Sequence, residues 1–439
     1  MTVEAPPVSP EAPGPPRGDS IGSAVLAAAA RGFAAFAIVT AVGVAIGLAE
    51  YAATNGAYRL WTWVKVGFLY VLSFCGVGLH VESTAFPSLG GHDLGLRLPM
   101  MAGTGLVVWL LFRAGRSTAE RTRNLDPGAR ALAILSTALA FAIPALLASL
   151  PATLRFPDLG ATIAPVRWEA ALLPLGLALS VAVAGGVGSW WVAPRDEPPR
   201  MERVTAMIRG GWKMFIAALL LAFIGFLILA AMKPGPTGAY ARVVRDAGRS
   251  GTVAIAHHAL LLPNQSIWLL GPAMGGSTQV GILLPGESPT TITLSGIDGG
   301  PLGRFLYPSE AFNEHNRLAL GGGFYLFLLV PLGATLLGGR RAAEGPLPMG
   351  ERALRGAGAG VVFGVLMAVG AWFSATMFPL PVPVDIPGAL PASIYATMPS
   401  TAVLALIWGV VGGVLGALSS RWPASTEPVV GDQELAEPA

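Results

Sequence analysis

The sequence predicts an all-α polytopic membrane protein with about eight transmembrane helices, and its composition gives the first reason. The 439 residues are 53% hydrophobic and only 12% charged, and the mean hydropathy is +0.62. A soluble domain carries about 25% charged residues. A water-soluble fold of this size could not cover its surface with polar side chains, so most of the chain is expected to lie in a lipid bilayer.

The second reason is the number of apolar stretches that are long enough to cross the hydrocarbon core, which takes about 20 residues. Short polar or Pro-rich segments separate these stretches from one another. The eight expected spans lie at residues 32–52, 98–114, 130–150, 168–192, 211–232, 320–340, 354–376 and 399–419.

Arginine clusters predict which helix ends face the cytoplasm, because short cytoplasmic loops hold an excess of Lys and Arg. We expect a multi-pass protein of a bacterial inner (plasma) membrane, with residues 1–20 and 423–439 as disordered cytoplasmic tails and residues 151–166 and 377–397 outside. The bias of Arg over Lys, with abundant Ala, Gly and Pro, favours an actinobacterial source. The three clusters are Arg113, Arg116, Arg121, Arg123 and Arg130; Arg195, Arg200, Arg203 and Arg209; and Arg340, Arg341, Arg352 and Arg355.

Residues 61–80 are also apolar, yet they are not expected to cross the membrane. Counting them as a span would move the loop that contains Arg113 to the outer side, against the charge rule. The segment is therefore predicted to be an embedded or interfacial helix at the outer face, with Trp61 and Trp63 at the headgroups and Lys65 in polar surroundings.

Residues 252–275 form a second such segment, which is interrupted by Pro263, Asn264 and Gln265. Proline removes a backbone donor and breaks a helix, and each of the two parts is too short to span the core. The pattern predicts two half-helices in a re-entrant hairpin that opens to the outer side.

The two halves of the chain repeat one order of predicted elements: a span, an outer embedded helix, an external loop, a span, an Arg-rich loop, a span, a Pro-rich loop and a span. Because both halves begin inside, we expect two parallel four-helix repeats related by an axis along the membrane normal. They occupy residues 21–193 and 211–422, with a cytoplasmic linker at 194–210. The second repeat includes a small external β-containing cap at 276–319, where the run TTITLSG predicts a strand.

The polar break supplies the candidate functional residues, because polar groups at membrane depth are costly and often functional. In the structural interpretation, which we favour, the amides cap the half-helix ends, and the histidines hydrogen-bond to neighbouring helices or lie among the headgroups. Adjacent histidines point about 100° apart on a helix, so they make a poor metal pair. The candidates are His257, His258, Pro263, Asn264, Gln265 and Trp268.

Catalytic, cofactor and metal sites are not predicted. Cys75 is the only cysteine, which excludes a Cys-based metal cluster. His80, Glu82, His92 and Asp93 follow no HExxH pattern, and they are interpreted as solvated loop residues. The basic residues form no continuous stripe, so a nucleic-acid partner is not expected. No acidic residue lies clearly at the centre of a span, which argues against an ion-coupled transporter.

The stretch LLLPNQSIWLLGPAMGG at 260–276 resembles the actinobacterial PerM-like proteins and is similar to the streptophobe family. The matching positions are Leu262, Pro263, Asn264 and Trp268, whereas Gly271-Pro-Ala-Met-Gly-Gly departs from the Gly-x-Gly-Phe of those families. The resemblance implies a non-enzymatic factor of the envelope or of cell division that contacts other membrane proteins, with no catalytic residue and no cofactor.

Two other functions stay open. A transporter for a small substrate is suggested by the repeat and by the embedded helices, which are like the discontinuous helices of carriers. A membrane enzyme that acts on a lipid-linked substrate at the outer face would use His257 or His80.

Overall fold

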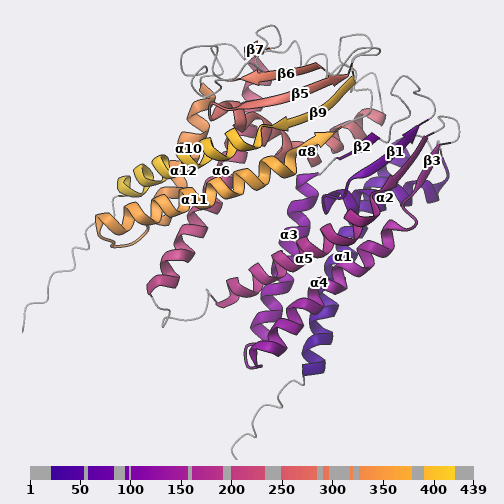
Figure 1. Ribbon diagram of the computed structural model, residues 1–439, viewed down its shortest axis with the longest axis horizontal. Helices are drawn as coiled ribbons and strands as arrows, with labels where there is room; N and C mark the ends of the chain where they lie inside the picture. Colours follow the sequence, from indigo (N-terminus) through magenta and orange to yellow (C-terminus); the bar gives the residue numbers. More distant parts are fainter. Residues whose placement is uncertain are drawn as a thin grey trace, which may run out of the picture.

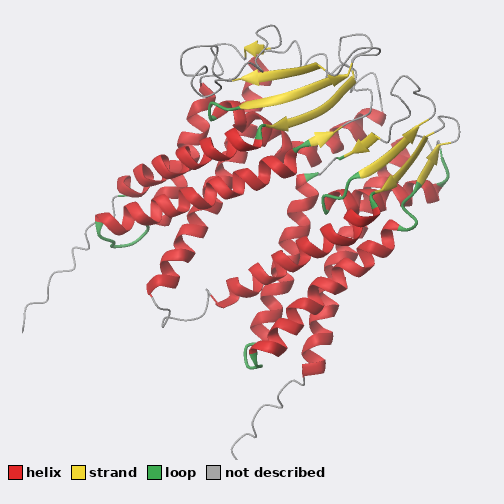
Figure 2. Cartoon of the chain, in the orientation of Figure 1, coloured by secondary structure: helices red, strands yellow, loops and turns green. Residues whose placement is uncertain are grey.

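The described part of the chain forms two helical bundles, each with a small sheet at one end (Figure 1, Figure 2). The structure is a computed structural model that describes residues 21–53, 58–83, 94–97, 100–156, 161–190, 199–232, 249–283, 290–295, 317–319, 326–377 and 390–420.

Each half of the chain supplies one bundle and its sheet. The first half contains α1 (Ile21–Ala53), α2 (Leu60–Phe74), β1 (Leu79–Ser83), β2 (Leu94–Leu96), α3 (Met101–Arg121), α4 (Pro127–Ser149), β3 (Leu154–Phe156), β4 (Ala161–Pro165) and α5 (Arg167–Trp190). The second half contains α6 (Pro199–Met232), α8 (Arg249–Ala273), β5 (Ser277–Leu283), β6 (Thr290–Ser295), β7 (Arg317–Ala319), α10 (Leu329–Ala342), α11 (Met349–Ser374), β8 (Thr376–Met377), β9 (Leu390–Ala396) and α12 (Met398–Ser419).

Local sequence explains several helix boundaries. At the start of α4, Asp126 accepts a hydrogen bond from the Ala129 amide at 2.8 Å, and Pro127 occupies the first helical position, where no N–H is needed. After α2 and α8 the chain turns through Gly76 and Gly275, which have φ of 81° and 94°. Glycine adopts this left-handed conformation without a steric cost. Both helices therefore end in a turn that a glycine in this conformation makes possible.

The strands of the two halves pair in the same order. One sheet has the order β2-β1-β4-β3 and the other β7-β6-β5-β9-β8, which is the same order with β7 added beside β6. In each half, the residue before the last helix bonds back to the start of the first strand. The Val166 amide donates to the Gly78 carbonyl at 2.9 Å, and the Thr397 amide donates to the Ser277 carbonyl at 3.0 Å.

Equivalent helix pairs also approach each other closely at small residues in both halves. A Cβ on any of four helical glycines would meet a backbone carbonyl oxygen of the neighbouring helix, so only glycine allows these contacts. The glycines, with the carbonyls and the distances of such a Cβ, are Gly32 with Thr137 (2.0 Å) and Gly115 with Ala182 (2.2 Å) in the first half, and Gly211 with Ala359 (2.6 Å) and Gly339 with Gly413 (2.2 Å) in the second.

Six of the described helices are long and apolar enough to cross a bilayer, namely α1, α4, α5, α6, α11 and α12, and the chain is a multi-spanning membrane protein. Each bundle has its own core, in which Phe141 and Phe363 are fully buried at matching positions of α4 and α11. The two other expected spans coincide with α3, which carries Arg113 and Arg116, and with α10, which has 14 residues.

The structure corrects the interpretation of residues 252–275. The segment lies in α8, which is one continuous helix that contains Pro263 and Pro272, so the predicted pair of half-helices and the re-entrant hairpin are wrong. By contrast, the 15-residue α2 is too short to cross the hydrocarbon core, as expected for residues 61–80.

The strand predicted from TTITLSG is confirmed as β6, but the β structure is more extensive than expected. Strand β9 lies in the segment 377–397, which was expected to be a loop, and the sheet of the first half was not predicted at all. Residues 199–210, which were expected in the linker, belong to α6.

Candidate functional site

Helix α8, which carries the residues that the sequence singled out, lies between the two bundles and contacts both. Leu260 and Leu261 pack against the core of the first half. About two to three turns further along the helix, Ile267 and Leu270 are fully buried in the core of the second half. The middle and the C-terminal part of α8 therefore belong to different cores, and α8 joins the two halves.

Asn264 on α8 makes a hydrogen bond between the two halves. Its side chain is fully buried, and its Oδ1 accepts a hydrogen bond from the Met101 amide at 3.1 Å. Met101 is the first residue of α3, where the helix itself offers no acceptor for the N–H, and Met100 before it provides no side-chain cap. Asn264 thus caps a helix of the other half. Its expected role as a cap at the end of a half-helix is wrong, because α8 is continuous.

Trp268 fixes α8 on the second half. Its indole Nε1 donates to the Ser374 carbonyl at the end of α11, at 2.9 Å. Pro272 has no N–H, so the Trp268 carbonyl lacks its usual partner four residues on. The Thr278 hydroxyl donates to that carbonyl instead. This bond satisfies the carbonyl that Pro272 leaves without a helical donor in the last turn of α8, which ends at Ala273.

The other predicted candidates are less defined. Pro263 lies inside α8, and Gln265 is half-buried beside Asn264. His257 and His258 fall on the backbone of α8, but their side chains lie outside the described residues.

Two buried carboxylates near the sheets are paired. Glu169, which is 5% exposed, accepts from the Gly78 amide at 2.6 Å and pairs with Arg97 at 2.6 Å. Glu50 accepts from the Tyr70 hydroxyl. Each of these bonds stays within the first half and ties a helix end to a neighbouring element.

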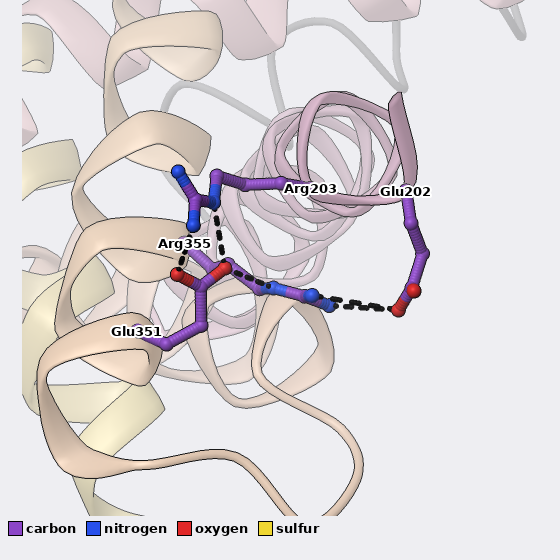
Figure 3. A network of polar contacts seen from close by, with 4 residues as sticks. All are labelled: Glu202, Arg203, Glu351 and Arg355. Carbon is purple, nitrogen blue, oxygen red and sulfur yellow. Dashed lines mark hydrogen bonds and ion pairs between the residues drawn. The ribbon is translucent and has the colours of Figure 1, made fainter. Parts of the chain in front are cut away.

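A network of four charged side chains joins α6 to α11 at the end of the second bundle that lies away from the sheets (Figure 3). Arg203 contacts both oxygens of Glu351, at 2.8 and 2.7 Å. The Glu351 carboxylate also accepts from Arg355 Nε at 2.9 Å, and Arg355 reaches Glu202 at 3.3 Å. Because the Arg355 side chain is only 8% exposed, its charge depends on these two carboxylates.

The first half carries no such network at the matching positions. Aligning LDPGARAL of the first half with LPMGERAL of the second places Ala129 and Ala133 opposite Glu351 and Arg355. The charge network is therefore a difference between two otherwise similar bundles.

Within the described residues, no group of three or more His, Cys, Asp or Glu side chains could hold a metal ion. His80 lies 3.4 Å from Glu82 on β1, while His92 and Asp93 lie outside the described part of the chain. Lys65, expected in polar surroundings, donates to the Thr153 carbonyl at 3.1 Å.

Sequence reasoning missed the charge network. The spacing of Glu351 and Arg355, four residues apart on one helix, is a signal of an ion pair, but their partners Glu202 and Arg203 are distant in sequence. No family model, curated protein or solved structure matches this chain.

Proposed function

We propose that the chain is a non-enzymatic protein of a bacterial inner membrane that supports the envelope or cell-division machinery by binding other membrane proteins. The observation that carries this proposal is the pairing of buried charges. Glu50, Glu169 and Arg355 each bond to partners inside their own half. A carrier that couples to protons or sodium needs an ionisable group that can exchange its ion, and these groups are committed to structural contacts.

The proposed arrangement has eight spans in two parallel repeats, with α3 and α10 as the seventh and eighth. It is supported by the common order of helices and strands in the two halves. The α3–α4 and α10–α11 turns, where Arg residues cluster, lie at the ends of the bundles away from the sheets, as do the start of α1 and the end of α12 (Figure 1). Both termini then face the cytoplasm, and the sheets face outward.

The outward sheets are the proposed surface for partners, which fits the resemblance of residues 260–276 to PerM-like and streptophobe proteins. The test follows a fluorescent fusion of the full chain in dividing cells of its source bacterium, together with a deletion strain. We expect the fusion to concentrate at the septum and the deletion strain to form longer cells. A multi-pass protein of unrelated function serves as the control for even distribution. An even distribution of the fusion, with normal cell length in the deletion strain, would remove the basis for the proposal.

The alternative is a transporter for a small substrate, and the joint at α8 is the observation that favours it. Two similar bundles that meet at one helix could move against each other about that helix, as the halves of carriers do. A deletion strain that divides normally but accumulates less of one external solute would support this alternative.

A further inference from the structure

A cavity of about 410 Å³ lies beside the charge network of the second bundle. Small-molecule sites typically enclose about 300–1,000 Å³. The walls come from α6, α10, α11 and the turn after α10. Its charged lining residues are Glu202, Arg209, Lys213, Arg341, Glu344 and Arg355.

The cavity has an excess of positive charge. Arg341 pairs with Glu344, and Arg355 is held by Glu202 and Glu351. Arg209 and Lys213 are exposed, and in the part of the chain that the structure describes neither has a hydrogen-bond or ion-pair partner. Two cations that point toward one cavity without partners favour an anionic ligand.

The surface next to these cations is apolar. On a helix, residues spaced by four, three and four positions share one face, so Arg209 and Lys213 lie in line with Ile216 and Leu220. Ile216 is 36% exposed and Leu220 is 57% exposed, and Ile224 continues the apolar face one turn further at 50%. Because α6 is one of the helices able to span a bilayer, this apolar face meets lipid chains, and the two cations lie directly before it, between the start of the helix at Pro199 and Ile216.

We propose that the cavity binds a phosphate group, and that this group belongs to the headgroup of an anionic phospholipid whose acyl chains lie along Ile216 and Leu220. Arg and Lys side chains bind phosphate through charge-assisted hydrogen bonds, and basic pockets between transmembrane helices at the cytoplasmic side bind anionic headgroups. The site belongs to the second bundle, since the α1 residue that matches Lys213 is Ala34, counted from the equivalent Gly32 and Gly211. The proposal holds whether the chain is an envelope factor or a transporter.

Native mass spectrometry of the purified full-length protein in detergent can test this proposal by titration with phosphatidylglycerol or phosphatidylcholine. We expect the protein to bind phosphatidylglycerol more tightly, and the double variant Arg209→Gln/Lys213→Gln to lose affinity by roughly 30-fold, since each cation near a headgroup contributes about fivefold. The matched control is Arg121→Gln/Arg123→Gln, which removes two exposed cations at the corresponding end of the first bundle. This control should change the affinity by less than about twofold.

Competition with inorganic phosphate and with glycerol 3-phosphate separates a lipid from a soluble anion. We expect neither to displace phosphatidylglycerol below millimolar concentration, because only the lipid also contacts the apolar face of α6. Displacement by micromolar phosphate would mean that the ligand is a soluble anion, and the lipid proposal would be wrong. Equal affinity for the two lipids, or an equal loss in the control variant, would also overturn it.

Discussion

The Asn264 side chain on α8 accepts a hydrogen bond from the Met101 amide at the first turn of α3, so an amide from one half of the chain caps a helix of the other half. Replacing Asn264 by Ala should lower the free energy of unfolding by about 1–2 kcal/mol, because a helix cap is lost at a fully buried position. Thermal unfolding of the purified protein in detergent measures the effect.

The control for this prediction is Thr401→Val. Thr401 is also fully buried, but its hydroxyl has no hydrogen-bond partner among the residues that the structure describes. An isosteric apolar replacement should therefore leave stability unchanged or raise it. If both variants lose the same stability, Asn264 contributes through volume and not through the cap.

The bond from Thr278 to the Trp268 carbonyl predicts a coupling between Thr278 and Pro272. Thr278→Val should destabilise the protein by about 1–3 kcal/mol, since it leaves the part-buried Trp268 carbonyl without a donor. Pro272→Ala supplies the missing N–H four residues after Trp268. In a double-mutant cycle, Thr278→Val should cost less in the Pro272→Ala background than in the wild type. Strict additivity of the two changes would contradict the proposed compensation.

The charge network predicts that the loss of the Glu351 charge destabilises the protein more than the loss of an acidic charge in a comparable surface pair. Glu351→Gln should lower the free energy of unfolding by about 2 kcal/mol, because it leaves the buried Arg355 with Glu202 as its remaining partner. The exposed pair Arg116–Glu120 has the same spacing, and Glu120→Gln should cost under about 1 kcal/mol. Chemical or thermal unfolding of both variants tests this difference, which disappears if the network is only a surface feature.

The close helix contacts predict that Gly→Ala substitutions act in matched pairs. Gly115→Ala and Gly339→Ala should each reduce the yield and stability of folded protein, since the new Cβ would lie 2.2 Å from a carbonyl oxygen of the neighbouring helix. Gly105→Ala and Gly176→Ala meet nothing within 4 Å and should be neutral or stabilise by up to about 1 kcal/mol through helix propensity. A tolerated Gly339→Ala beside a harmful Gly115→Ala would argue against equivalent packing in the two halves.

Because Cys75 is the only cysteine, thiol labelling of cysteines introduced elsewhere can map the membrane orientation. Burial raises the pKa of the Cys75 thiol to about 12 in the turn after α2, so the thiolate is a minor species at neutral pH and Cys75 should react with maleimide only after unfolding. Single cysteines at the exposed positions Arg155 in β3 and Arg123 after α3 should then differ in their labelling in intact cells. An impermeant maleimide should label position 155 and spare position 123. The reverse pattern would invert the proposed topology.

The helices were largely predictable from sequence because the length of an apolar run that crosses the membrane is set by the thickness of the hydrocarbon core. Their common order in the two halves could also be expected, since LDPGARAL and LPMGERAL recur at the same place after an Arg-rich turn. The strands of the first half could not be predicted from the sequence. Strand β1 has five residues, and it is defined by pairing with β4, where Val81 lies opposite Ile163 in a distant part of the chain.

Helix α8 shows why a local rule misled the interpretation of the candidate site. A proline inside a helix costs about 3 kcal/mol, which favours a break at Pro263. In the folded chain the helix runs through Pro263, and the next residue, Asn264, is fixed by the Met101 amide of α3. At Pro272 the carbonyl left without its helical donor accepts from Thr278. Both partners lie outside residues 252–275, so a pattern confined to that segment could not reveal these contacts.

The two bundles differ in charge at matching positions, where Ala129 and Ala133 of the first half correspond to Glu351 and Arg355 of the second. An approximate twofold axis would make a neighbour that arrives from either side meet the same surface. Here the exposed side chains of Glu202 and Arg203 present charge at the second bundle, whereas Ala129 and Ala133, at the positions matching Glu351 and Arg355, are buried in the first bundle and present none. In the proposed role of binding other membrane proteins, a partner that contacts these charges would bind in one orientation only, so the chain would set the direction of an assembly although its two halves share the same order of helices and strands.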